Sequence, residues 1–200
     1  MTRSLAWGLV AASCASFVAC SSAAVRTETP VGAPAPNAHT LFTRALAAQE
    51  ADQRDQAQAL WKQVIALVPN HAAPHTNLGI VYRLDGRVLD AITEYETAIR
   101  LDPADAAAYH NLGLAHRARG AWTDAERAYL RALELRPNQA VTHYNLGILY
   151  ELFLNRPEAA LTQYRTVVSL GGPDTDTVAQ WIRTLERRLT PHESSPPGAP

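Results

Sequence analysis

The sequence is poor in cysteine, in aromatic residues and in net charge, and each shortage excludes a class of protein. Its 200 residues include two cysteines, Cys14 and Cys20, so the chain beyond residue 20 holds no disulfide. The formal net charge of −1 provides no basic excess for binding nucleic acid. Aromatic residues make up 7% and hydrophobic residues 47%, with much alanine among them. This balance is typical of packed helices.

The first 19 residues have the form of an export signal. Arg3 gives a short positive start, and residues 5–18 are apolar over a length too short for a comfortable membrane span. The following stretch, Phe17-Val18-Ala19-Cys20-Ser21-Ser22, resembles a bacterial lipobox, in which the cysteine is lipidated (palmitate) and becomes the mature N-terminus. We therefore predict a lipoprotein-type signal peptide over 1–19 and lipidation at Cys20. The alternative is ordinary cleavage after Ala23 or Ala24.

Two stretches have neither a helical nor a strand period. Residues 20–37 are rich in alanine, serine and proline, which predicts a flexible tether after the lipidated cysteine. Residues 191–200 contain four prolines and are predicted to be disordered.

Between these stretches the chain repeats itself every 34 residues. The tetrapeptide Asn-Leu-Gly-Ile or Asn-Leu-Gly-Leu occurs at 77–80, 111–114 and 145–148, and prolines recur with the same spacing at 69, 103 and 137. Proline disfavours helix at the preceding residue, so each proline ends a helix. Self-similarity at one period of this length is typical of stacked helical repeats.

The residues at each phase resemble the tetratricopeptide-repeat (TPR) family. The best copy reads His75, Leu78, Gly79, Tyr82, Ala91, Tyr95, Ala98, Pro103. The last copy is shifted by one residue after an insertion near 154–157. The resemblance implies an all-α fold, a right-handed α-solenoid of about four helix pairs over 38–190. The expected repeats are 38–71, 72–105, 106–139 and 140–174, followed by a capping helix over 175–190.

Three glycines lie inside predicted helices, at 79, 113 and 147, where glycine costs about 1 kcal/mol relative to alanine. A close approach of two helices explains this cost. We expect Ala91, Ala125 and Ala160 to meet the glycines, with the tyrosines four residues later buried at the same seam.

Three asparagines at one phase, Asn77, Asn111 and Asn145, are the strongest candidates for binding a partner. Asparagine is a mediocre mid-helix residue, and its amide can pair with both polar groups of a main chain. The resemblance implies that they line a concave peptide groove. The alternative is that the amides bond neighbouring helices or face water.

Neighbouring positions on the same helices would shape this groove. Arg83 and Arg117 could grip a carboxylate or an acidic segment, or they could simply be a solvated helix face. No basic residue adjoins Leu78, Leu112 or Leu146, so a clamp for a C-terminal carboxylate is not expected. The remaining predicted peptide-binding residues are His110, Tyr144, Ile80, Leu114 and Ile148.

We expect no catalytic residue, no cofactor, no metal and no nucleic-acid partner. His71 and His75 are four residues apart, but flanking prolines place His71 in a turn, and His75 and His143 occupy a packing position. No nucleophile is placed beside a base, and no phosphate-binding loop is present in the sequence.

The expected function is therefore a non-catalytic protein–protein interaction scaffold of the bacterial envelope, which holds a partner segment in its groove. Ser21 after Cys20 resembles lipoproteins of the outer membrane, so we expect an exported, lipid-anchored protein that faces the periplasm. The alternative is a structural module that associates with itself as a homodimer or larger oligomer.

Overall fold

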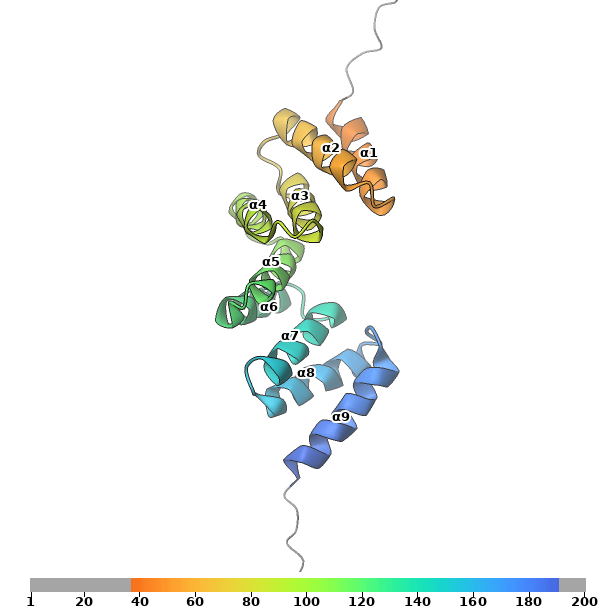
Figure 1. Cartoon of the computed structure of the whole chain (residues 1–200), viewed down its shortest axis with the longest axis vertical. Coiled ribbons are helices and arrows are strands. Elements are labelled where there is room, and N and C mark those ends of the chain that lie inside the picture. Colours follow the sequence, from red (N-terminus) through yellow and green to blue (C-terminus); the bar gives the residue numbers. More distant parts are fainter. Residues whose placement is uncertain (1–36, 191–200) are drawn as a thin grey trace, which may run out of the picture. The chain divides into compact units, whose positions relative to one another are not determined.

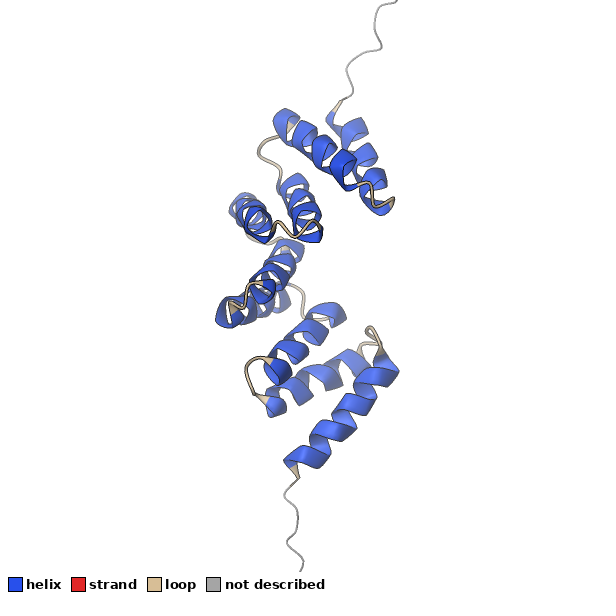
Figure 2. Cartoon of the chain, in the orientation of Figure 1, coloured by secondary structure: helices blue, strands red, loops and turns tan. Residues whose placement is uncertain are grey.

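The computed structural model describes residues 37–190, which form helices joined by short loops. Figure 2 shows helices and no strand in this part of the chain. The predicted signal peptide, Cys20, nearly all of the tether and the predicted tail lie outside the described residues. The helices are α1 (Ala38–Glu50), α2 (Arg54–Leu67), α3 (Ala72–Leu84), α4 (Val88–Leu101), α5 (Ala106–Ala118), α6 (Trp122–Leu135), α7 (Ala140–Leu152), α8 (Pro157–Ser169) and α9 (Thr175–Leu189).

The helices pack in sequential pairs, α1 with α2, α3 with α4, α5 with α6 and α7 with α8 (Figure 1). Each pair also packs on the next, and α9 packs on α8. Such stacking buries one continuous core that no single pair could bury alone. The predicted all-α solenoid is confirmed.

The loops inside the pairs show why the last repeat is out of phase. Three residues separate the two helices of the first three pairs, whereas four residues, 153–156, separate α7 from α8. The predicted insertion is therefore in this loop. Its Asn155 adopts a left-handed backbone conformation with φ of 49°, and Gly86 and Gly120 take a similar conformation in the earlier loops.

The glycines inside α3, α5 and α7 are explained by tyrosine rings. A Cβ added to Gly79 would lie 2.5 Å from Cε1 of Tyr95. A Cβ added to Gly113 would lie at the same distance from Cε1 of Tyr129, and one added to Gly147 at the same distance from Cε1 of Tyr164. The tyrosine ring is therefore the group nearest to the glycine, and the prediction that these tyrosines are buried at the seam is confirmed. Alanine contributes by letting that helix approach, since Ala91, Ala125 and Ala160 are fully buried.

The histidines expected to pack in the core do so with a polar partner. Nδ1 of His75 lies 2.7 Å from Glu94 Oε2, and Nδ1 of His143 lies 2.7 Å from Gln163 Oε1. Each contact joins the first helix of a repeat to the second, so a histidine replaces the usual aromatic residue without leaving a buried polar atom unpaired. Residues 37–190 contain no group of histidines, cysteines and acids suited to a metal ion.

One face of the array is formed by the first helices of the repeats. Helix α3 contacts α5, and α5 contacts α7, whereas within the described array the second helices do not meet one another to the same extent. Neighbouring repeats are therefore closest on the side of the first helices, which makes this side the inner face. No helix in the described part is long and apolar enough to span a membrane.

Candidate functional site

The three candidate asparagines have the same conformation on α3, α5 and α7. The Nδ2 of Asn77 donates to the carbonyl of Ala73 at 2.9 Å, and Asn111 and Asn145 repeat this bond to Ala107 and Val141, also at 2.9 Å. The amides therefore bond their own helix and not the neighbouring helices. One Nδ2 proton is used in this way, while the second proton and Oδ1 lie outside these helix bonds.

The predicted apolar positions of the inner face are partly buried. Ile80 packs against the core of the first two repeats, and Leu114 and Ile148 pack against the core of the last two. Their half-buried side chains lie one turn from the asparagines, so each first helix offers an amide beside an apolar surface.

His110 and Tyr144 are already engaged within the fold. Nδ1 of His110 lies 2.8 Å from Oγ1 of Thr142 on the next repeat, and the His110 side chain is 8% exposed. The ring of Tyr144 stacks on Trp181 of α9 with centroids 5.9 Å apart. Helix α9 therefore covers part of α7, and the predicted groove residue Tyr144 lies beneath this cap.

Two aligned positions in each repeat make a second row on the inner side. We define the inner position as Gln49, Arg83, Arg117 and Glu151, one at or near the end of each first helix. The ring position is on the second helix of each repeat and comprises Trp61, Tyr95, Tyr129 and Tyr164. The arginines were predicted to bind, whereas the tyrosines were assigned to the core alone.

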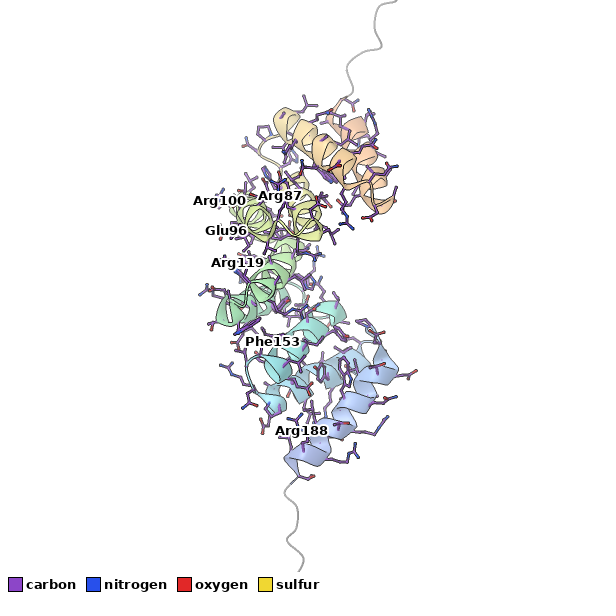
Figure 3. The ribbon with its side chains drawn as sticks, viewed as in Figure 1. Arg87, Glu96, Arg100, Arg119, Phe153 and Arg188 are labelled. Carbon is purple, nitrogen blue, oxygen red and sulfur yellow. The ribbon has the colours of Figure 1, made fainter. Side chains whose placement is uncertain are left out.

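The first and fourth repeats satisfy this row internally. Nε1 of Trp61 donates to Oε1 of Gln49 at 3.0 Å. The Tyr164 hydroxyl donates to Oε2 of Glu151 at 3.0 Å, and Oε1 of Glu151 lies 3.5 Å from Nη1 of Arg188. Arg188 lies on α9 (Figure 3). In both repeats the residue at the inner position accepts the hydrogen bond.

The two middle repeats leave the same row unpaired. The hydroxyls of Tyr95 and Tyr129 and the Nε of Arg83 are buried and have no hydrogen-bond partner among residues 37–190. No ion pair within residues 37–190 includes Arg83 or Arg117. Buried polar atoms without partners are rare in folded proteins.

The pKa shifts show that these groups lie together. Burial raises the pKa of Tyr95 to about 12, opposed by the nearby charge of Arg83. Burial also raises the pKa of Tyr129 to about 12, opposed by Arg117 and Arg83. Burial lowers the pKa of His110 to about 4, and the charges of Arg83 and Arg117 lower it further. At neutral pH this Arg–Tyr cluster, which comprises Arg83, Tyr95, His110, Arg117 and Tyr129, holds two positive charges, two protonated phenols and a neutral imidazole.

Three family models match the sequence. One described as "TPR repeat" matches residues 81–117, and two described as "Tetratricopeptide repeat" match 42–96 and 104–170. Together they span the four repeats from α1 to the end of α8. The chain belongs to the tetratricopeptide-repeat family.

Solved structures agree with this assignment. The TPR array is similar to the crystal structure of the MamA protein, with a TM-score of 0.65 and 25% identity over 75% of this chain and 81% of that one. A thermophilic TPR protein of Thermus thermophilus matches with a TM-score of 0.63, 22% identity, and coverage of 75% and 82%. The TPR domain of Arabidopsis OM64 matches with a TM-score of 0.56, 18% identity, and coverage of 57% and 94%. Among curated proteins, none matches the sequence significantly. The family models and the similar TPR structures support the role of a protein–protein interaction scaffold.

The TPR array also has a hollow of about 620 Å³ among α4, α5 and α6. His116, which lines it, stands where the second and fourth repeats have Tyr82 and Tyr150, and its Nδ1 is buried without a partner. Two ion pairs beside the hollow, Arg127 with Asp124 and Arg131 with Glu134, are each closed within α6. The charges at this hollow are thus largely neutralised, in contrast to those of the Arg–Tyr cluster.

Proposed function

We propose that this TPR protein is a non-catalytic adaptor that holds an extended segment of a partner protein along its inner face. The row of Asn77, Asn111 and Asn145 is the observation that supports this most. Their side chains share one conformation, and each has an amide proton and an acceptor outside its helix bond. Asn77 and Asn111 are half-buried, and Asn145 is 8% exposed. An extended main chain presents donors and acceptors at regular intervals, which such a row can pair.

The other groups of the inner face are suited to binding rather than catalysis. Guanidiniums stay charged at all physiological pH values, and the phenols of Tyr95 and Tyr129 have pKa values of about 12, so they do not ionise near neutrality. The half-buried Ile80, Leu114 and Ile148 would contact apolar side chains of the segment. We therefore assign no catalytic role to this face.

Replacing Asn77, Asn111 and Asn145 together by alanine is expected to reduce partner capture at least about tenfold. Each lost hydrogen bond contributes about 0.5–1.5 kcal/mol, and three losses act on one ligand. The fold should be retained, because alanine is the better helix former. The measurement is a pull-down from envelope extract with the full chain in detergent as bait, quantified beside the melting temperature of each variant.

The matched control for this experiment replaces Asn70 and Asn138, which are exposed residues of the loops before α3 and α7. This double variant should capture the partner as the original chain does. Equal capture by the original chain and the triple variant would show that the asparagines do not bind the partner.

We further propose that the protein is exported and anchored by lipid at Cys20 in the outer membrane, facing the periplasm. The support is the sequence around Cys20, which lies outside the described residues. A Cys20→Ala variant is expected to move from the membrane fraction to the soluble periplasmic fraction, since one acylated residue is its only anchor in this proposal. Cys14→Ala is the control and should stay with the membrane. Persistent membrane attachment of Cys20→Ala would indicate an uncleaved signal that acts as the anchor.

Self-association is the alternative, and exposed apolar surface on the terminal helices would favour it. The large exposed hydrophobic side chains of the described residues lie on neither α1 nor α9; they are Leu67, Leu84, Leu89, Leu130, Val141, Leu152, Phe153 and Leu170. A partner in the groove is therefore the better supported function, and a concentration-dependent mass measurement on the full chain distinguishes the two.

A further inference from the structure

The four repeats differ in whether the hydrogen-bond donor at the ring position has an acceptor within its own repeat. In the first repeat the donor of Trp61 is bonded to Gln49, and in the fourth the donor of Tyr164 is bonded to Glu151. In the second and third repeats the inner position holds arginine, which has no acceptor atom. The hydroxyl protons of Tyr95 and Tyr129 therefore have no acceptor within the described residues.

The fourth repeat shows which group such a site accepts. The Glu151 carboxylate binds two donors there, with one oxygen 3.0 Å from the Tyr164 hydroxyl and the other 3.5 Å from Nη1 of Arg188. The Arg–Tyr cluster presents the same two kinds of donor, phenol and guanidinium, and none of its five residues has a carboxylate. A carboxylate has two oxygens, so it can accept from one donor of each kind, and a guanidinium binds a carboxylate strongly.

The electrostatic balance of the cluster favours the same ligand. Arg83 and Arg117 form no ion pair in residues 37–190, and the nearby His110 is neutral at pH 7 because burial lowers its pKa to about 4. Two charges with partly buried side chains are therefore uncompensated. A ligand with a single negative charge would reduce this repulsion and supply acceptors for the buried donors.

We propose that the Arg–Tyr cluster receives the carboxylate of an aspartate or glutamate side chain of the partner segment, between the second and third repeats. The inference rests on the proposed function, because it requires a segment lying along the inner face. It adds that the partner segment has an aspartate or a glutamate at the position that meets the Arg–Tyr cluster. The row of asparagines would hold the main chain, and the cluster would select the side chain.

Removing only the two hydroxyls tests the cluster without disturbing the fold. Tyr95→Phe combined with Tyr129→Phe leaves both rings in place and removes hydroxyl protons that have no acceptor among the described residues. The melting temperature should therefore stay unchanged or rise. Tyr164→Phe is the matched control, because it removes a hydroxyl that is bonded inside the protein. This control should lower the melting temperature and leave ligand binding unchanged.

The probe is a set of short peptides selected from a random displayed library on the full chain in detergent. Peptides that bind the inner face should share an aspartate or a glutamate. Changing that residue to its amide should weaken binding at least about tenfold, as expected for a charged hydrogen-bond pair. In the Tyr95→Phe/Tyr129→Phe variant, and in Arg83→Gln/Arg117→Gln, this preference for the acid should fall below about threefold.

Several results would overturn the inference. Selected peptides without a shared acid, or an equal preference for the acid in the hydroxyl-free variant, would show that the cluster does not read a carboxylate. Tighter binding when a phosphoserine replaces the acid would show that it is built for phosphate. Tighter peptide binding after Glu28→Gln or Glu193→Gln would show that the chain's own acid fills the cluster.

The same peptides separate this inference from the proposed function. Binding that the triple asparagine variant weakens, but that is indifferent to the acid, would overturn only the inference about the carboxylate. Finding no peptide whose binding depends on Asn77, Asn111 and Asn145 would overturn both.

Discussion

Tyr129→Ala is expected to lower the free energy of unfolding by about 3–5 kcal/mol, the cost of removing a large buried aromatic side chain. The Tyr129 ring is fully buried, lies against Gly113 and has its centroid 5.8 Å from that of His110. Its removal would open a cavity in the middle of the array, where neighbouring repeats on both sides rely on the packing. Denaturation by urea, followed by circular dichroism, measures the effect.

A double-mutant cycle with Gly113 identifies the ring as the cause. Gly113→Ala alone should destabilise by about 1–3 kcal/mol, because its Cβ would lie 2.5 Å from Tyr129 Cε1. In the Tyr129→Ala background the same change should be neutral or favourable, since alanine is about 1 kcal/mol better than glycine in a helix. Additive effects of the two changes would show that the glycine has some other role.

Acidification should destabilise the fold through His110 by about 2 kcal/mol between pH 7 and pH 5. The pKa of His110 falls from 6.5 to about 4 on folding, chiefly because the ring is buried and secondarily because Arg83 and Arg117 repel the added proton. The unfolded chain therefore binds more protons in this window, so stability increases with pH. The contribution is fully present above pH 6.5, is lost as the pH falls, and is gone below about 4.

His110→Gln removes this titration while keeping a side chain that can bond Thr142. The dependence of the unfolding free energy on pH should become shallower in this variant between pH 7 and pH 5. His116 is a second contributor of the same sign, because burial lowers its pKa as well. A His116→Gln variant therefore measures the part of the pH dependence that His116 contributes. If His110→Gln leaves the dependence of the unfolding free energy on pH unchanged, the assignment to His110 is contradicted.

The fold could be predicted from the sequence because each repeat uses the same contacts. A glycine at 79, 113 or 147 faces a tyrosine at 95, 129 or 164, and these pairs recur at one spacing with one additional residue in the last. Contacts within one repeat recur in every repeat, so the residues that make them recur at one spacing in the sequence. The same reasoning located the loop between α7 and α8, where that residue is inserted.

The site could be predicted only in part, because it depends on side-chain conformations and on contacts that occur once. The bond from each asparagine to its own helix is a choice of rotamer, which spacing does not reveal. The stacking of Trp181 on Tyr144 belongs to α9, which has no counterpart in the other repeats. The first feature is a side-chain conformation and the second occurs once, so the spacing of residues in the sequence predicts neither.

The Arg–Tyr cluster did leave a signal in the sequence. The inner position reads Gln, Arg, Arg, Glu along the array, while the ring position reads Trp, Tyr, Tyr, Tyr. The ring position holds a hydrogen-bond donor in every repeat. Where the inner position changes from an acceptor to arginine, that donor has no acceptor at the facing position. Comparing the aligned positions as pairs, rather than each one separately, would have found the tyrosine hydroxyls.

The stacking of the repeats has a mechanical consequence. The buried side chains fall into two cores, one centred on α1 to α4 and the other on α6 to α9, and the two adjoin at α5 and α6. Because each helix pair is held by its neighbours alone, a pulling force on a bound partner would act on the junctions between repeats one after another. The packing between repeats is thinnest where α6 meets α7, so the array would open there first and lengthen elastically under tension.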